Sequence, residues 1–240
     1  MARHLAKAGI ASLRIDFAGL GDSRGLPGKE MMISEAFEAR VPDIKAAIDR
    51  LQDLGYRRIA VQGICSGAFH AFHAGLADPR IGMLLLLNIP LFQEAYAEES
   101  NTAIHEAVPW QYYFDRLART RTWARLLSGR GNLPGVLRGR FRRLWRGGGV
   151  ELNPANFTRS AMTHLSERGV KTLFLFGPDE VGYYTVEDVF GPAGADLVKL
   201  DHVTLKVIET FDHIIGMPMA QEEATSAMLG NLLSWRDAAV

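Results

Sequence analysis

The sequence predicts an α/β domain built on a mostly parallel sheet with helices on both faces. Short, nearly continuous apolar runs alternate with segments whose apolar residues recur at helical spacing, a pattern typical of strands buried on both sides. The 240-residue chain is 48% hydrophobic and 22% charged, which is enough to bury one sizeable core. The alternation stops between about 90 and 165 and then resumes, which indicates an insertion.

The first part of the chain predicts three helices and three strands. Helices are expected at 2–8, closed by Gly9, at 42–54 with Pro42 in the first helical position, and at 67–77. Strands are expected at 10–15, 58–62 and 81–88. A long Gly-rich loop follows the first strand at 16–28.

The last part restores the strand and helix rhythm. Strands are expected at 170–177 and 204–209, followed by a closing helix at about 219–236. We therefore divide the chain into an α/β core, residues 1–89 and 166–240, and a helical, Arg-rich cap or lid, residues 90–165.

Composition favours a cytoplasmic protein. The single cysteine rules out an intramolecular disulfide, and the N-terminal residues MARHLAKAG contain no apolar stretch of the kind found in secretory signals. No apolar run reaches the 18 residues of a membrane-spanning helix. The neutral formal charge and a pI near 7.1 argue against nucleic acid as a partner.

The cysteine lies in a G-x-C-x-G turn between an apolar strand and a helix. Such a turn is tight, so small residues are expected on both sides of Cys65, and Gly63 and Gly67 provide them. The turn would aim the backbone N–H of Ser66 at a developing oxyanion, and the helix end would lower the pKa of the thiol. An inert, buried thiol and Ser66 as the nucleophile are the alternatives.

An acid and a histidine follow at the ends of later strands, in the order that a nucleophile turn requires. The acid is Asp179 or Glu180, after the strand at 170–177, and the histidine is His213, after the strand at 204–209. The carboxyl ends of parallel strands meet at one edge of a sheet, so we expect these groups to converge. His202 is the competing base, while His70 and His73 are interpreted as packing residues.

These motifs together resemble the α/β-hydrolase family. The matching segments are LRIDFAGLGDSRG, GICSGA, LFGPDE and FDHIIG, and they span nearly the whole chain. The resemblance implies an α/β-hydrolase fold and acyl transfer through a covalent acyl-enzyme. By position it makes Cys65 the nucleophile, His213 the general base and Glu180, three residues after Gly177, the orienting acid, with Asp179 as the alternative.

The chain departs from the family in two ways. Cysteine replaces the usual serine, as in dienelactone hydrolases, which favours activated esters, thioesters and lactones over amides. The family also carries several strands and an oxyanion loop before the first helix, whereas this sequence begins within that helix, so it is N-terminally short. A truncated start, or a weakened or non-catalytic binding or scaffold protein, would explain this. An exposed sheet edge would then favour a homo-oligomer.

The early loop and the remaining clusters carry no separate chemistry. Asp16 is interpreted as structural, with Asp22 and Ser23 holding the Gly19–Gly21 turn through backbone hydrogen bonds. A phosphate site would need a P-loop lysine, and no Cys/His cluster has the spacing of metal ligands. We therefore expect neither a cofactor nor a metal.

The insertion contains ten Arg and no Lys, Asp or Glu between 116 and 150. A solvated lid face is the first interpretation, binding of an anionic part of a small ester or thioester substrate the second, and contact with an anionic membrane the third. Four aromatic residues are expected to line the substrate pocket: Trp110, Tyr112, Tyr113 and Phe114.

Overall fold

The computed structural model of the chain describes residues 1–24, 35–90 and 154–238. Four strands of these residues form a parallel sheet in the order β1-β2-β3-β4. They are β1 (Ile59–Ile64), β2 (Ile81–Leu87), β3 (Lys171–Phe176) and β4 (Val203–Val207). The predicted α/β class with a parallel sheet is confirmed.

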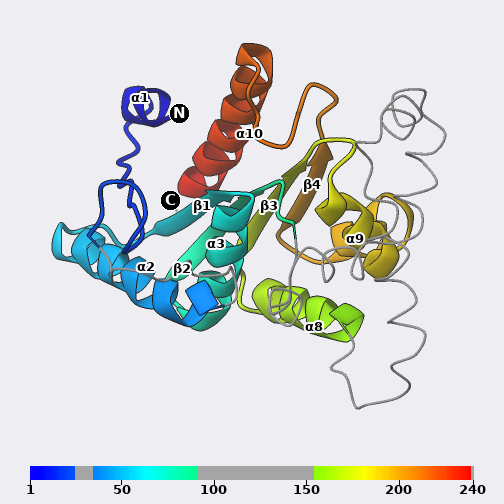
Figure 1. Cartoon of the computed structure of the whole chain (residues 1–240), viewed down its shortest axis with the longest axis horizontal. Coiled ribbons are helices and arrows are strands. Elements are labelled where there is room, and N and C mark those ends of the chain that lie inside the picture. The colour runs from blue at the N-terminus through cyan, green and yellow to red at the C-terminus, as the bar shows by residue number, and fades with distance from the viewer. Residues whose placement is uncertain (25–34, 91–153, 239–240) are drawn as a thin grey trace, which may run out of the picture.

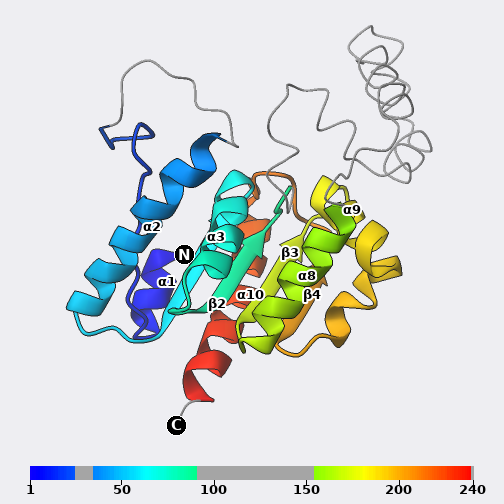
Figure 2. The same cartoon turned by 90° about the horizontal axis from the view of Figure 1, so that it is seen from below.

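Helices cover both faces of the sheet (Figures 1 and 2). One face carries α2 (Glu35–Asp53), α3 (Ser66–Ala77), α8 (Pro154–Glu167) and α9 (Val181–Phe190), and the other carries α1 (Ala2–Lys7) and α10 (Pro218–Asp237). Two short 3₁₀ helices, η2 (Pro192–Gly194) and η3 (Leu197–Lys199), lead from α9 to β4.

Strand β2 shows why the apolar runs are continuous. Leu84 and Leu86 pack on the side of α2, α3 and α8, whereas Met83, Leu85 and Leu87 pack on the side of α10. Since side chains alternate across a strand, both sets must be apolar when both faces of the sheet are covered.

The strand predicted at 10–15 is wrong. These residues adopt no regular structure, and Leu13 and Ile15 are 47% and 40% exposed. A strand is held by hydrogen bonds to a neighbour, and within the described part of the chain no strand pairs with this segment. An apolar, β-branched pattern was therefore insufficient to form a strand here.

The second helix begins earlier than predicted. Helix α2 starts at Glu35, so Pro42 lies inside the helix instead of in its first turn. A proline in a helix interior removes one backbone hydrogen bond and costs several kcal/mol, roughly 3. Burial of Ile44 and Ile48 against the sheet, with only 5% and 2% exposure, offsets this cost.

Of the predicted insertion, 90–165, only residue 90 and residues 154–165 fall within the described part of the chain. Helix α8 lies there, and its Met162 and Leu165 are fully buried in the core beside α3. Residues 91–153, with the Arg-rich segment and the four predicted lining aromatics, lie outside the described part of the chain. The division into core and cap therefore stays a prediction.

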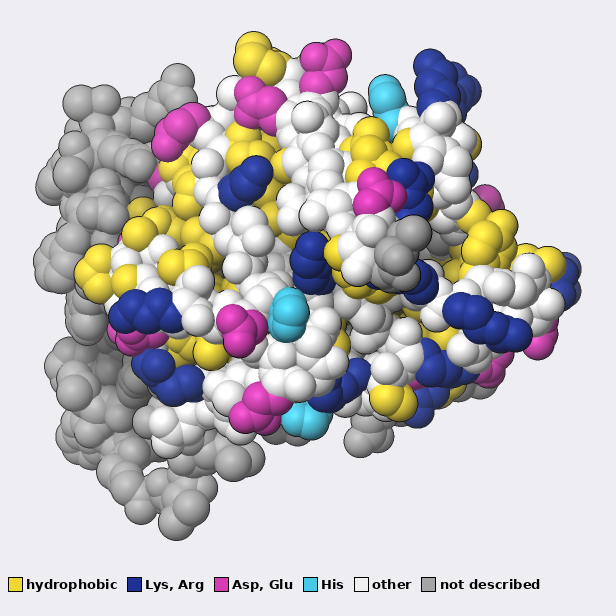
Figure 3. All heavy atoms as spheres, turned by 180° about the vertical axis from the view of Figure 1, so that it is seen from behind, with side chains coloured by type: hydrophobic (Ala, Val, Ile, Leu, Met, Phe, Trp, Pro, Cys, Tyr) yellow, Lys and Arg dark blue, Asp and Glu magenta, His cyan; other side chains and the backbone are white. Residues whose placement is uncertain are grey.

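The described surface mixes charges of both signs. On the face shown in Figure 3, Lys and Arg side chains lie interspersed with Asp, Glu and apolar groups. Among the described helices, none is both long and apolar enough to cross a membrane.

Candidate active site

Cys65 lies in a strained turn at the carboxyl end of β1. Its backbone has φ 52° and ψ −122°, a region that residues with a side chain rarely adopt. Its N–H donates to the Leu87 carbonyl at 2.9 Å, and its own carbonyl accepts from Ala68 and Phe69 at 2.9 and 3.1 Å. These bonds join the turn to β2 on one side and to α3 on the other, which holds the thiol in place.

Strand β1 and helix α3 lie so close together that one of the two glycines of the turn, Gly63, cannot be replaced by a larger residue. A Cβ on Gly63 would overlap the backbone of Gly67 and Ala68, so no side chain fits at residue 63. A Cβ on Gly67 would meet no atom within 4 Å. The expectation of an obligatory small residue thus holds for Gly63 and is wrong for Gly67.

The structure brings Cys65, His213 and Glu180 into one chain of contacts. Nδ1 of His213 lies 2.9 Å from Oε2 of Glu180, and Nε2 lies 3.1 Å from Sγ of Cys65. If Nδ1 carries the proton and donates a hydrogen bond to the carboxylate, Nε2 is left as an acceptor that faces the thiol. This is the geometry that a general base needs.

The three side chains come from the ends of three strands. Cys65 follows β1, Glu180 is the residue before α9 and follows β3, and His213 lies in the turn after β4. Glu180 is largely buried, at 11% side-chain exposure, whereas the His213 side chain is 52% exposed. The histidine is therefore held by Glu180 on one side and is half exposed.

The other candidate residues lie in different places. Asp179 is exposed beside Glu180, and the contact to His213 is made by Glu180. His202 precedes β4, at the opposite end of the strand from His213. Ser66 is the first residue of α3, so its side chain is one position past the apex of the turn.

Burial changes the acidity of the thiol. It raises the pKa of Cys65, the charge of Glu180 raises it further, and the backbone N–H of Ser66 opposes both effects. The expected lowering of this pKa by the helix end is therefore wrong, because desolvation of the thiolate outweighs the single N–H.

The early loop is held differently from expectation. The carboxylate of Asp16 accepts a hydrogen bond from the N–H of Asp22 at 3.4 Å, and it fills the space that a Cβ on Gly21 would need. The side chain that contacts this turn is therefore that of Asp16. The side chains of Asp22 and Ser23 were expected to make the contact. His70 and His73 are buried on α3, each 6% exposed, as packing residues are.

One residue near the triad was not found from the sequence. Asn88 directly follows β2 and is fully buried. Its side-chain amide contacts the turns that carry Glu180 and His213. The signal was present, because Asn88 is the polar residue that ends the apolar run IGMLLLL, but polar residues at strand ends are common and its spacing from the triad follows no motif.

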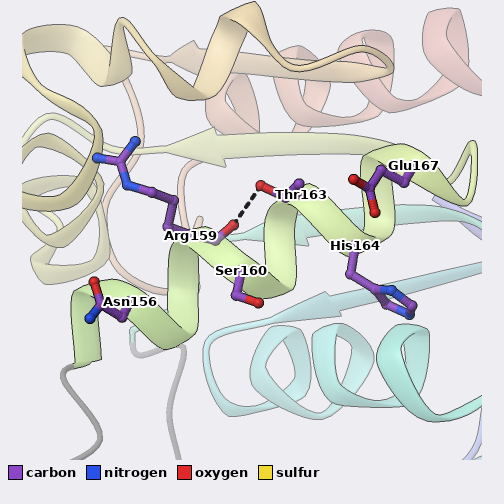
Figure 4. A pocket seen from close by; sticks show the side chains of 6 residues that line it. All are labelled: Asn156, Arg159, Ser160, Thr163, His164 and Glu167. Atoms are coloured by element: carbon purple, nitrogen blue, oxygen red, sulfur yellow. Dashed lines mark hydrogen bonds between the residues drawn. The ribbon is translucent and has the colours of Figure 1, made fainter.

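A separate open hollow runs along α8 (Figure 4). Neither Cys65, His213 nor Glu180 lines it. All of its lining residues come from that one helix: Asn156, Arg159, Ser160, Thr163, His164 and Glu167. It is a feature of the helix surface, apart from the candidate active site.

Comparisons with known proteins cover the chain only in part. No protein-family model matches it. Over 116 residues, 45% of this chain, it is 33% identical to the uncharacterized protein YcjY of Escherichia coli (strain K12), and the match spans 36% of that relative. The chain therefore covers well under two thirds of the curated relative that it matches.

A solved structure aligns over a longer stretch. It is that of a proline iminopeptidase-related protein from Thermus thermophilus, and the alignment covers 90% of this chain and 78% of that one, with a TM-score of 0.44 and 18% identity. A likeness at this level carries no argument about family or activity.

Proposed function

We propose that the protein is a hydrolase that cleaves a carboxylic ester or thioester through an acyl-enzyme on Cys65. The observation that supports this most strongly is the unbroken contact from Glu180 through His213 to Cys65, at 2.9 and 3.1 Å. The order of the three groups along the chain is also that of the α/β-hydrolase resemblance. The strained backbone of Cys65 adds support, because such strain gathers at functional sites.

The first half of the reaction acylates the thiol. Nε2 of His213 takes the thiol proton as Sγ of Cys65 bonds to the substrate carbonyl carbon, and the carbonyl oxygen gains the negative charge. The N–H of Ser66, at the start of α3, is the proposed donor to that oxygen. Collapse of the intermediate breaks the bond to the leaving alcohol or thiol, which takes the proton from the imidazolium.

The second half releases the acid. Nε2 of His213 accepts a proton from water as the water oxygen attacks the acyl carbon, and the Cys65 thiolate leaves and regains the proton. The side chain of Glu180, in contact with Nδ1 of His213, stabilises the imidazolium that forms in each half.

The raised thiol pKa bears on the class of substrate. A protonated thiol must be deprotonated during the attack, so carbonyls that accept a nucleophile readily are the expected substrates. Thiolate is also a better leaving group than an amine. The tetrahedral intermediate formed from an amide would therefore expel the Cys65 thiolate and return to the reactants. Activated esters and thioesters, including ones with an anionic portion, are the class that we propose.

The test is hydrolysis of p-nitrophenyl acetate, longer p-nitrophenyl esters and acyl thioesters by the full chain. Cys65→Ala and His213→Ala should each lower kcat/KM at least about a thousandfold. Glu180→Gln should lower it about a hundredfold or more, because the imidazole loses its charged partner.

Asp179→Asn is the matched control for the acid, since it removes the neighbouring carboxylate and leaves the contact to His213 in place. It should retain wild-type activity. Full activity of Cys65→Ala would overturn the mechanism. If the intact protein hydrolyses no member of the panel, the alternative of a non-catalytic binding protein replaces the hydrolase.

A further inference from the structure

Asn88 joins the turn that carries the acid to the turn that carries the histidine. Its Oδ1 accepts the N–H of Gly177 at 3.0 Å, three residues before Glu180. Its Nδ2 donates to the carbonyls of Asp212 and His213, each at 3.0 Å. One side chain therefore joins the turn that follows β3 to the turn that follows β4.

The orientation of the amide follows from its partners. An N–H can donate only to Oδ1, and the two carbonyls can accept only from Nδ2, so the reverse orientation would leave all three groups facing a group of their own kind. The two hydrogens of Nδ2 match the two carbonyls. Asn88 is 0% exposed, so water cannot replace any of these bonds at low cost.

The backbone of Asn88 also explains the residue type. Its φ is 46°, in the left-handed region where Asn is tolerated better than most residues. Its N–H donates to the Leu175 carbonyl at 2.8 Å, which extends the pairing of β2 with β3 by one residue. The left-handed turn thus brings the amide into contact with the turns that follow β3 and β4.

We propose that Asn88 is a positioning residue that holds the His213 turn so that Nε2 faces the Cys65 thiol, an inference that rests on the proposed function. Cys65 and Asn88 directly follow β1 and β2, while Glu180 and His213 lie in the turns after β3 and β4. His213 is half exposed, so its own packing provides little restraint. The bonds from Asn88 to its turn add restraint to that of the Glu180 contact.

Two variants of Asn88 separate the side chain from the backbone. Asn88→Gly removes the amide but accepts the left-handed φ without strain. Asn88→Asp keeps the acceptor for the Gly177 N–H and loses both hydrogens that bind the 212 and 213 carbonyls.

The first readout is the rate at which iodoacetamide alkylates Cys65, measured across a range of pH. Cys65 is the only thiol of the chain, so the rate reports on this site alone and needs no substrate. His213→Ala should slow alkylation at neutral pH, because the imidazole no longer accepts the thiol proton. Asn88→Gly and Asn88→Asp should slow it in the same pH range.

The double variant Asn88→Gly/His213→Ala decides whether Asn88 acts through His213. If it does, the double variant should alkylate at the rate of His213→Ala, within about twofold, because the two changes remove the same coupling. If the double variant instead alkylates more slowly than His213→Ala by the full factor seen for Asn88→Gly alone, the proposal is overturned. Alkylation of both Asn88 variants at the wild-type rate would also overturn it. Failure of both variants to fold would also overturn it, because Asn88 would then be needed for the fold itself.

The second readout is hydrolysis of p-nitrophenyl acetate. A displaced imidazole should lower kcat about a hundredfold and leave KM nearly unchanged, since the displaced group acts in the chemical step. Asn231→Ala is the control, because it removes an amide-to-carbonyl bond of 2.9 Å within α10, away from the site. It should match wild type in both readouts.

The two proposals can fail separately. In one outcome, the wild type hydrolyses no ester while the double variant Asn88→Gly/His213→Ala still alkylates at the rate of His213→Ala. In that case the hydrolase is rejected and the positioning role stands. If the wild type hydrolyses esters through Cys65 while the alkylation losses multiply, the positioning role is rejected and the hydrolase stands.

Discussion

Cys65 combines a strained backbone with a thiol whose pKa is raised by burial. The positive φ places Sγ beyond the end of β1, 3.1 Å from Nε2 of His213, while burial raises the thiol pKa. A raised thiol pKa makes a base in contact with the thiol more useful for its deprotonation, and His213 is the group in that position. The sequence motif predicted the position of the thiol, but its acidity depends on packing that no motif describes.

His70 gives the protein a sensitivity to acid. Burial, and secondly the charge of Arg40, lower the pKa of His70 from 6.5 to about 4. Between these values the unfolded chain binds a proton that the folded protein does not. The stability present above the unfolded pKa is therefore lost as the pH falls toward the folded pKa.

We expect His70→Phe to remove part of this loss. Phenylalanine keeps an aromatic ring beside Phe17 and Phe69, whose centroids lie 5.3 and 5.5 Å from that of His70. Between about pH 7.5 and pH 4.5 the variant should lose roughly 2 kcal/mol less of its unfolding free energy than wild type. Urea unfolding at both pH values measures this. The exposed His164→Gln is the control, and equal losses in His70→Phe and wild type would contradict the assignment.

At the scale of elements, the site depends on how closely β1 and α3 meet. Cys65 is both the residue after β1 and the residue before α3, so any change in their separation moves the thiol. The strand, turn and helix were predicted nearly to their observed ends. The strand at 10–15 and the start of α2 were not, because both depend on tertiary partners as well as on local pattern.

Gly63→Ala and Gly67→Ala form a matched pair that tests this closeness. The first places a Cβ against the Gly67 carbonyl and should destabilise the fold by about 3 kcal/mol, with loss of activity. The second meets open space within a helix, where alanine is favoured, and should change stability by less than about 1 kcal/mol. Thermal unfolding of both variants provides the comparison. Equal losses of stability in the two variants would show that the backbone contact at Gly63 does not exclude a side chain.

At the scale of the whole molecule, the parallel sheet assembles the site. The aligned ends of the four strands bring Cys65 and His213 together across 148 residues of sequence. Because the carboxyl ends of parallel strands share one edge, the order of the motifs predicted that Cys65, His213 and an acid at residue 179 or 180 would meet. The family resemblance favoured Glu180 over Asp179, and in the structure it is Glu180 that contacts His213.

The contacts of Asn88 could not be predicted from the sequence. A buried amide that binds three backbone groups has no fixed spacing from them, since its partners lie 89, 124 and 125 residues away. Only the folded sheet brings these groups together.

Trapping the acyl-enzyme tests the central claim most directly. The full chain is mixed with p-nitrophenyl acetate, quenched in acid within the first turnover, and analysed by mass spectrometry as intact protein and as peptides. If the Cys65–His213–Glu180 triad works as proposed, one acetyl group should appear on the peptide that contains Cys65 and be absent from Cys65→Ala. Ester turnover with no acetyl group on Cys65, or with the group on another residue such as Ser66, would contradict it.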